Sequence, residues 1–290
     1  MAIVRRTSTT TYMSASDQAA HLKVYSAQET VTKYAALDTL SACEQALFDT
    51  YLRPGMAILD LGVGAGRTTP YLSAIASRYV GVDYSEEMIR ACRNKFPHLQ
   101  FNVADAADLS QFADASFDAV VFSYNGIDCL AHDKRESCLR ECHRVLKAGG
   151  VCIFSTHNPR SLFLAWRWDR ERLRRMASRV SRGKGVLFNL TLAALTCARV
   201  TLAFTKSFWK AIPRAWRRLP TATFWRGEGP VVDPSYGGLV YYCAIPACVI
   251  AETTRAGFRL LKSLPEDYPA TGYQYSTRWY YYAFSKDGGK

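Results

Sequence analysis

Glycine and aspartate residues gather around one short apolar run near the start of the chain. Residues 57–61 are apolar except for Asp60 and predict a strand buried on both faces. Three alternating glycines follow the run, namely Gly62, Gly64 and Gly66. Because glycine has no Cβ and readily reaches positive φ, such a loop lets the backbone pass close to a ligand. The carboxylate of Asp60 favours a ligand with an ammonium group over one with a pyrophosphate, which it would repel.

The spacing of these glycines argues against dinucleotide binding. A dinucleotide fingerprint has the form G-x-G-x-x-G, and its third glycine would stand at position 67, where this sequence has Arg67. The pattern here is G-x-G-x-G. We therefore disfavour an NAD-dependent oxidoreductase.

Two side chains that can accept a proton stand after later apolar runs. His157 directly follows residues 151–156, and Asp128 lies shortly after residues 117–123. Histidine titrates near neutral pH, so His157 is the better candidate for a general base and Asp128 is the second. The alternative for His157 is a loop histidine that is capped by the backbone.

Strand-like apolar runs alternate with stretches of helical periodicity along most of the chain. The predicted strands are residues 57–61, 78–83, 99–103, 117–123, 151–156, 259–264 and 278–285. The predicted helices are residues 69–76, 85–96, 133–147 and 248–256, preceded by one or two helices within 18–52. Ser85 is expected to cap its helix, and Gly149 with Gly150 to end the helix before them. The alternation predicts an α/β fold with a doubly wound, mostly parallel sheet and a ligand at the carboxyl ends of its strands.

Four signals in chain order resemble the class I S-adenosylmethionine-dependent methyltransferases of the small-molecule type. Residues 60–66, D-L-G-V-G-A-G, resemble the first motif of the family, and residues 117–123 its fourth-strand motif. Residues 144–150, R-V-L-K-A-G-G, resemble its R-V-L-K-P-G-G signature, with Ala148 in place of the usual proline. Ala-Gly-Phe258 and the tyrosine-rich last strand are also family-like. The resemblance covers roughly residues 20–159 and 238–286. It implies a seven-stranded Rossmann-like fold whose last strand runs antiparallel between the fifth and the sixth.

The same resemblance implies S-adenosylmethionine as the methyl donor and assigns residues to it. The methionine part would be held by Asp60 and the backbone at Gly62 and Gly64, and Gly66 would also belong to the cofactor-binding loop. Asp83 would bind both ribose hydroxyls, and Asp105 with Ala106 would contact the adenine edge. Tyr84 and Met88 would pack on the adenine face, and Ser123 would lie beside the donor. Tyr25 and Tyr34 either enclose the cofactor or belong to the core.

The acceptor pocket has four candidate residues, which are Tyr124, Asn125, Tyr236 and Tyr241, with Tyr242 beside them. Tyrosines at alternating positions are equally typical of a strand. We expect no metal: Cys138, Cys142 and His143 share one helix, but a second ligand cluster is missing, so a buried structural role is favoured.

Composition points to a globular protein with one unusual segment. The chain has 290 residues, 49% of them hydrophobic, and a formal net charge of +12. Nine cysteines without a C-x-x-C pair, and no signal-peptide pattern, predict reduced thiols in the cytoplasm. Residues 160–220 hold 15 Lys or Arg and 2 Asp or Glu, while the remainder holds 22 basic and 23 acidic residues. One segment therefore carries the basic character of the whole chain.

That segment defines the predicted domain organisation. We expect a disordered tail over residues 1–17, a catalytic domain over 18–159 and 230–290, and a basic helical insertion over 160–229. Five of the six tryptophans lie within 160–226, and the apolar and basic positions alternate at helical spacing. Basic amphipathic helices lying on the inner face of an anionic membrane are one interpretation, and a lid packed on the catalytic domain is the other. Nucleic acid is disfavoured, because few polar groups that read bases interrupt the apolar face.

The sequence thus predicts an S-adenosylmethionine-dependent methyltransferase that acts on a small-molecule or lipid-linked acceptor. A hydroxyl of a sugar, glycolipid or other amphiphilic metabolite is the first choice. An N- or C-methyltransferase of a natural product is the alternative, followed by a catalytically silent, membrane-associated binding protein. The oligomeric state is left open.

Overall fold

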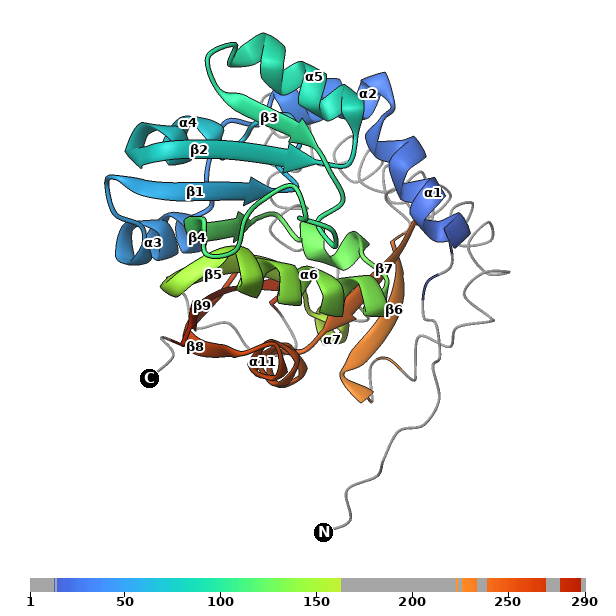
Figure 1. Ribbon diagram of the computed structural model, residues 1–290. Coiled ribbons are helices and arrows are strands. Elements are labelled where there is room, and N and C mark those ends of the chain that lie inside the picture. The colour runs from blue at the N-terminus through green and yellow to red at the C-terminus, as the bar shows by residue number, and fades with distance from the viewer. Residues whose placement is uncertain are drawn as a thin grey trace, which may run out of the picture.

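A seven-stranded sheet forms the centre of the computed structural model (Figure 1). The structure describes residues 13, 15–162, 223, 226–233, 239–269 and 277–287. The strands follow the order β3-β2-β1-β4-β5-β9-β8. Their bounds are Met56–Leu61 for β1, Ala76–Asp83 for β2, Gln100–Val103 for β3, Phe117–Phe122 for β4, Leu146–His157 for β5, Phe258–Pro265 for β8 and Trp279–Lys286 for β9. The first five strands are parallel, and β9 is antiparallel to both neighbours, β5 and β8. The predicted fold class and the place of the last strand are confirmed.

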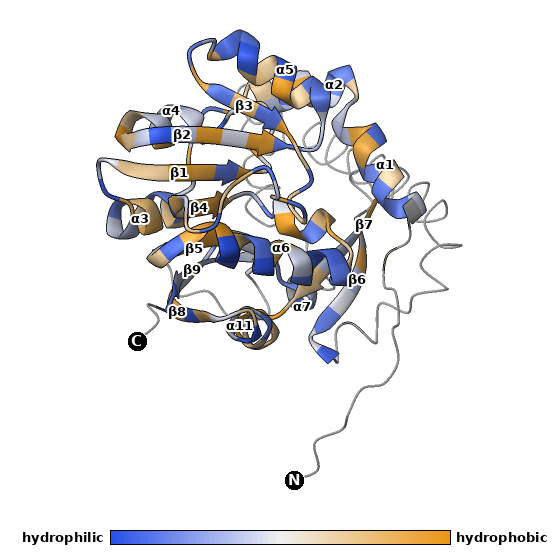
Figure 2. Ribbon diagram, viewed as in Figure 1, coloured by the Kyte–Doolittle hydropathy of each residue, from blue (hydrophilic) through white to orange (hydrophobic). Residues whose placement is uncertain are grey.

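Helices cover both faces of the sheet. They are α1 (Ala15–Tyr25), α2 (Gln28–Ala35), α3 (Ala42–Tyr51), α4 (Thr69–Ile75), α5 (Glu86–Lys95), η1 (Gly126–Cys129), α6 (His132–Val145), α7 (Pro159–Leu162) and α11 (Pro246–Arg255). One core places Leu47, Leu72 and Ile89 of α3, α4 and α5 against one face of the sheet. The other core places Leu139 of α6 and Val249 of α11 against the opposite face. Strands covered on both sides are largely apolar where they are buried, and orange stretches along β1 and β2 show this (Figure 2).

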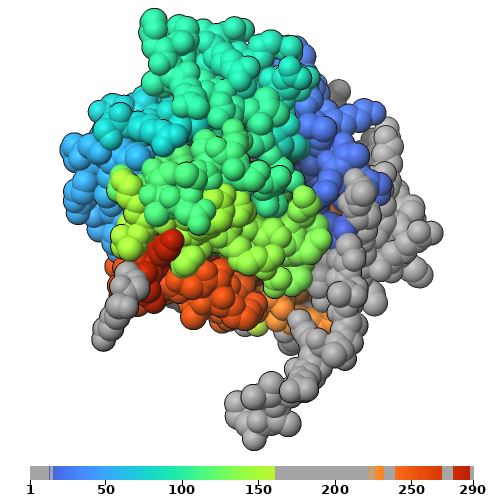
Figure 3. All heavy atoms as spheres, in the orientation of Figure 1, coloured from blue at the N-terminus to red at the C-terminus, as the bar shows by residue number. Residues whose placement is uncertain are grey.

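The parallel strands all end at one edge of the sheet, and α1 lies beyond that edge (Figure 1). In the space-filling view the blue atoms of the N-terminal helices lie beside the green atoms from the middle of the chain (Figure 3). A two-stranded hairpin, β6 (Glu228–Asp233) with β7 (Leu239–Ala244), stands at the same edge. His21 of α1 hydrogen-bonds the carbonyl of Val240 in β7 at 2.7 Å, which joins the helix to the hairpin.

Three local expectations need correction. The segment before β1 forms three helices rather than one or two, because Ser41 makes a capping box with Glu44 and starts a separate α3. Strand β5 begins at Leu146 instead of residue 151, so Gly149 and Gly150 lie inside it. The β6–β7 hairpin was not predicted, although the alternating tyrosines of β7 are indeed in a strand. The cap at Ser85 is confirmed, since its hydroxyl accepts from the Met88 amide.

The ends of the proposed domains fall partly outside the described residues. Helix α1 begins at Ala15, within the expected tail, and the side chain of Met13 is buried. Residues 163–222, most of the basic insertion, lie outside the described part of the chain, as does Tyr236. Within the described ranges, no helix combines the length and apolar character that a bilayer crossing requires.

Candidate active site

A cavity of about 720 Å³ opens at the carboxyl edge of the sheet. Strands β1, β2, β4 and β5 end at this cavity, and α1, α2 and β7 contribute to its walls. Most of the predicted site residues line it: Tyr25, Tyr34, Gly62, Gly64, Asp83, Tyr84, Met88, Asp105, Ala106, Ser123, Tyr124, Asn125, His157 and Tyr241. Residues separated by more than two hundred positions therefore meet at one site, as a doubly wound sheet requires.

The glycine loop approaches the cavity through its backbone. Gly62 and Gly64 both have positive φ, at 58° and 56°, and both line the cavity. A Cβ on Gly62 would lie 2.5 Å from the ring of Phe122, so no larger residue fits there without movement. Gly66 also has positive φ but does not line the cavity, and a Cβ there would lie 2.6 Å from the ring of Phe96. Gly66 therefore allows the loop to pack on the end of α5, which corrects the expectation of a ligand contact.

Asp60 lies beneath the loop rather than at the cavity wall. Its Oδ2 accepts hydrogen bonds from the hydroxyls of Thr68 at 2.6 Å and Tyr79 at 2.8 Å. Burial raises the pKa of this carboxyl to about 6, against the two hydroxyl donors, which lower it. The predicted direct contact between Asp60 and a ligand is thus replaced by a supporting position behind the loop.

Asp83 ties the loop to the start of α5 at the cavity wall. Its Oδ2 accepts from the amide of Gly64 and its Oδ1 from the amide of Ser85, both at 2.9 Å. Burial raises the pKa of Asp83 to about 6, and the amide donors oppose that rise. Each carboxylate oxygen has a further lone pair, so the group can still accept from a ligand diol.

The residues predicted to contact adenine differ in how far they are exposed to the cavity. Asp105 and Ala106 line the cavity, and Asp105 accepts from the amide of Ala107 at 2.9 Å and pairs with Lys134 at 3.0 Å. Tyr84 has a buried hydroxyl for which the described residues offer no hydrogen-bond partner. A ligand in the cavity could supply one. Met88 is almost fully buried in a small core with Val31, so only its edge reaches the cavity.

Aromatic rings form the outer wall of the cavity. Tyr25 lies edge-on to Tyr34 and Tyr84, with ring centroids 5.9 and 6.4 Å away, and Tyr34 lies edge-on to Tyr124 at 6.4 Å. The hydroxyl of Tyr25 lies 3.1 Å from that of Tyr241. Tyr25 and Tyr34 thus pack against neighbouring rings and also line the cavity, so their contact with the cofactor stays a prediction.

His157 and Asp128 form a hydrogen-bonded pair at the floor of the cavity. The Nδ1 of His157 lies 2.8 Å from Oδ2 of Asp128, a carboxylate with no exposed surface. Because a carboxylate only accepts, Nδ1 carries the proton and Nε2 is the basic nitrogen. Nε2 lies 3.2 Å from the amide nitrogen of Asn125, which lines the cavity. His157 thus has the geometry of a general base, and Asp128 holds it in place.

Asp128 does not reach the cavity, so its role as a second base needs correction. Its Oδ2 also accepts from the backbone amide of His157 at 2.7 Å, and its Oδ1 accepts from the Thr156 hydroxyl and from Arg135 at 2.9 Å. Ligand atoms of Asp128, His157 and Cys243 lie within 4.8 Å of one another, a spacing that could hold a metal ion. In this arrangement Oδ1 of Asp128 already pairs with the guanidinium of Arg135, and Oδ2 accepts from the backbone amide and Nδ1 of His157.

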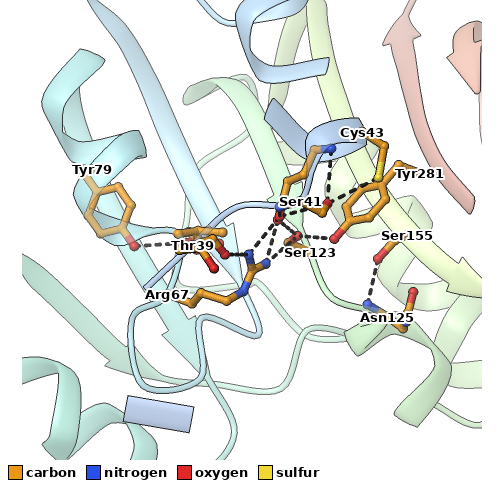
Figure 4. A network of polar contacts seen from close by, with 12 residues as sticks. Thr39, Ser41, Cys43, Arg67, Tyr79, Ser123, Asn125, Ser155 and Tyr281 are labelled. Carbon is orange, nitrogen blue, oxygen red and sulfur yellow. Dashed lines mark hydrogen bonds and ion pairs between the residues drawn. The ribbon is translucent and has the colours of Figure 1, made fainter. Parts of the chain in front are cut away.

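A second buried network joins the glycine loop to α3 and β4 (Figure 4). Arg67 donates to both carboxylate oxygens of Glu44, at 2.8 and 2.6 Å, and to the hydroxyl of Ser123 at 3.1 Å. The Ser123 hydroxyl also contacts Glu44 and lies 3.3 Å from the hydroxyl of Tyr281. The guanidinium lies 4.9 Å from the ring centroid of Tyr124. Ser123 thus lines the cavity from within a fixed network.

Sequence reasoning missed the charged residues of these networks. Arg135 stands three, four and seven residues before the buried Cys138, Leu139 and Cys142, and so occupies the apolar face of α6. Glu44 and Glu252 similarly lie on the buried faces of α3 and α11. A charge at an apolar position is the signal that could have found them, because such a charge requires a buried partner.

Known proteins are similar to this chain in the region that contains the glycine loop and strands β1 to β5. A profile of the methyltransferase domain matches residues 59–154. A demethylmenaquinone methyltransferase of Clavibacter sepedonicus is 39% identical over 108 residues, covering 35% of this chain and 42% of that protein. A probable S-adenosylmethionine-dependent methyltransferase of Mycolicibacterium smegmatis is 33% identical over 104 residues, covering 36% of this chain and 39% of that protein. The chain therefore matches less than half the length of these curated relatives.

Solved structures extend the likeness to the whole fold. One is the 1,6-didemethyltoxoflavin-N1-methyltransferase of Burkholderia thailandensis, with 1,6-didemethyltoxoflavin and S-adenosylhomocysteine bound. It superposes with a TM-score of 0.55 at 12% identity and covers 98% of each chain. At that identity the likeness concerns the fold alone. Residues 59–154 therefore match the methyltransferase domain, and the strand order gives the chain the fold of solved S-adenosylmethionine-dependent methyltransferases.

Proposed function

We propose that this protein transfers a methyl group from S-adenosylmethionine to a hydroxyl of a small-molecule acceptor. A sugar, a glycolipid or another amphiphilic metabolite is the acceptor class. The observation that carries the proposal is the hydrogen bond between His157 and Asp128, which leaves the basic Nε2 toward the cavity. Methylation of an alcohol requires removal of its proton, whereas more nucleophilic acceptors need no such base.

The residues of the cavity suit the cofactor of the family. Glycines with positive φ bring the backbone close, the Asp83 carboxylate can accept from a diol, and the Tyr84 hydroxyl is buried and lacks a partner among the described residues. S-adenosylmethionine supplies a methyl group that its sulfonium already activates. The protein's task is therefore to align the acceptor with that methyl group and to exclude water.

His157 takes the hydroxyl proton on Nε2 in this proposal. Asp128 keeps Nδ1 protonated, fixes the ring and stabilises the imidazolium that forms. The side-chain amide nitrogen of Asn125 lies 3.2 Å from Nε2 of His157. The hydroxyl of an acceptor would take this position. The backbone amide of Asn125 is held by the Ser155 hydroxyl at 2.7 Å, so the peptide beside the base is fixed (Figure 4). Tyr124, Tyr241 and Trp279 would form the aromatic side of the acceptor site.

The test measures methyl transfer by the wild-type protein and by His157→Gln with a panel of sugar, glycolipid and phenolic acceptors. We expect His157→Gln to lower kcat by about 10²-fold or more while the affinity for S-adenosylhomocysteine stays unchanged. Equal turnover by both proteins on the best acceptor would reject a base-dependent hydroxyl. It would favour a nitrogen or carbon acceptor, and the Burkholderia neighbour, an N1-methyltransferase by name, is an example of the former.

We also propose that residues 160–220, which lie almost entirely outside the described ranges, bring the site to amphiphilic acceptors at an anionic lipid surface. The support is their 15 basic and 2 acidic side chains, set in a tryptophan-rich stretch. Basic residues near such a surface contribute about 1 kcal/mol each. Co-sedimentation with liposomes should need anionic lipid and should fall at high salt, because the attraction is screened over about 10 Å at 0.1 M. No co-sedimentation at low salt would leave a substrate lid as the interpretation of this segment.

A further inference from the structure

A fully buried guanidinium joins the His157–Asp128 pair to a carboxylate from another part of the chain. Arg135 of α6 has no exposed surface. Its Nη1 donates to Oδ1 of Asp128 at 2.9 Å, and its Nε donates to Oε1 of Glu252 at 2.8 Å. The Nη2 atom also lies 2.8 Å from that oxygen. Glu252 belongs to α11, so the floor of the cavity is connected to the last helix of the fold.

The charges of this group do not balance while His157 is neutral. With both carboxyls ionised, Asp128 and Glu252 bring two negative charges against the single positive charge of Arg135. All three side chains are at most 3% exposed, so water screens the excess poorly. Protonation of His157 brings the group to neutrality. The excess negative charge therefore lies where it can stabilise the positive charge that His157 gains when it removes a proton.

The side chains that lie next to the His157 ring do not change this count. Asn125 is uncharged, and Tyr241 and Cys243 of β7 carry no charge in their protonated forms. Trp279 of β9 packs edge-on to the imidazole at 6.0 Å. Arg278, also of β9, has a side chain 62% exposed and paired with Glu266, so solvent and its partner reduce its effect.

We propose that Glu252 is a positioning residue for methyl transfer. It does not line the cavity, and it acts through Arg135 and Asp128 by supplying negative charge behind the residue that takes the acceptor's proton. Without that charge, Arg135 would neutralise Asp128 fully, and the positive charge that His157 gains during the reaction would lose part of its stabilisation. The proposal rests on the proposed function for its role in turnover, but the electrostatic effect on His157 can be measured without any methyl acceptor.

The experiment is an NMR titration of the histidine rings in the full chain. His157→Gln identifies the signal of His157 among the five histidines. Glu252→Gln keeps an oxygen for Arg135 but removes one negative charge, so we expect the titration midpoint of His157 to fall by on the order of one pH unit. Arg135→Gln removes the positive charge and should move the midpoint upward. Because the two changes act in opposite directions, either variant that folds tests the charge count.

Two further variants separate charge from structure. The pair Arg135→Gln with Glu252→Gln restores the original net charge and should return the midpoint toward the wild-type value. Glu141→Gln removes a carboxylate of α6 that pairs with Arg144 away from His157, and it should leave the midpoint in place. A folded Glu252→Gln protein with an unchanged midpoint, or a shift in the same direction in both single variants, would overturn the proposal. Where turnover is available, Glu252→Gln should lower kcat by roughly three- to tenfold at unchanged affinity for S-adenosylhomocysteine. Absence of turnover in the wild type would count against the proposed function alone.

Discussion

Arg67 and Glu44 form a two-bond ion pair that joins the glycine loop to the helix before β1, at 2.8 and 2.6 Å. The Glu44 side chain has no exposed surface and that of Arg67 is 11% exposed. The pair also holds Ser123 and lies beneath Tyr124, two residues of the cavity wall. Arg67 stands where a dinucleotide fingerprint has glycine, so the residue that argues against dinucleotide binding has a structural function of its own.

The first prediction concerns this ion pair. Arg67→Met should lower the free energy of unfolding by about 3–5 kcal/mol, because it leaves the Glu44 carboxylate buried without its partner. Urea unfolding measures the change. The double variant Arg67→Met with Glu44→Gln should recover much of the loss, since it removes the unpaired charge. A single-variant loss below about 1 kcal/mol would show that solvent reaches Glu44 and that the pair contributes little.

The second prediction distinguishes the two carboxylates that line the cavity. Asp83→Ala should weaken binding of S-adenosylhomocysteine by about 1.5–3 kcal/mol, the range for a hydrogen bond to a charged group. Asp105→Ala should cost less, because Asp105 is 43% exposed and already paired with Lys134. Titration calorimetry measures both. Equal losses, or none for Asp83→Ala, would contradict the assignment of Asp83 to the ribose.

The third prediction concerns pH. Since burial raises the pKa of Asp83 to about 6, the carboxyl of the free protein is protonated below that pH and ionised above it. Affinity for S-adenosylhomocysteine should therefore rise between about pH 5 and pH 7 and then level off. Asp83→Asn should abolish most of that rise. Burial also raises the pKa of Asp60 to about 6, so Asp60→Asn is the matched control. If the rise in affinity disappears in Asp60→Asn and persists in Asp83→Asn, the titrating group is Asp60 beneath the loop.

The same raised pKa has a consequence for the stability of the free protein. Asp83 in the folded state holds its proton to higher pH than the ordinary value of 3.8. The folded state thus binds more protons than the unfolded state between about pH 4 and pH 6, and its stability should decline as pH rises through that window. Thermal unfolding of wild type and Asp83→Asn across this range measures the effect, and parallel curves would contradict it.

The fourth prediction concerns Asp128. Asp128→Asn keeps the size of the side chain but replaces an acceptor of the Nδ1 proton with a group that can donate. The substitution Asp128→Asn should lower kcat by about 10²-fold or more, with little change in cofactor affinity. Single-turnover rates with the best acceptor measure this, and Thr156→Val, which removes one of the hydrogen bonds to Asp128, should cost less. Equal rates for wild type and Asp128→Asn would show that His157 does not act as a base.

Local sequence determined the framework of this protein. The apolar runs predicted the strands, and the glycine loop with the acids at or near the carboxyl ends of β1, β2 and β3 predicted which ends of the strands form the site. This works because a strand buried on both faces requires continuous apolar residues, and because parallel strands bring their carboxyl ends to one edge. Gly62, Gly64, Asp83 and His157 were found in this way, and all of them line the cavity.

Tertiary structure alone decided how the buried charges pair. Asp60 and Asp83 lie near the carboxyl ends of the neighbouring strands β1 and β2, yet one lies under the loop and the other at the cavity. Asp128 resembled a second base, but its hydrogen bonds to His157, Thr156 and Arg135 make it a buried partner. Arg135 and Glu252 meet across 117 positions of sequence. Helical periodicity can show that a charged residue falls on a buried face. The residue that pairs with it is fixed only by the packing of α6 and α11 on the sheet. The reason is that the energy of a buried charge depends on which opposite charge lies within a few ångströms.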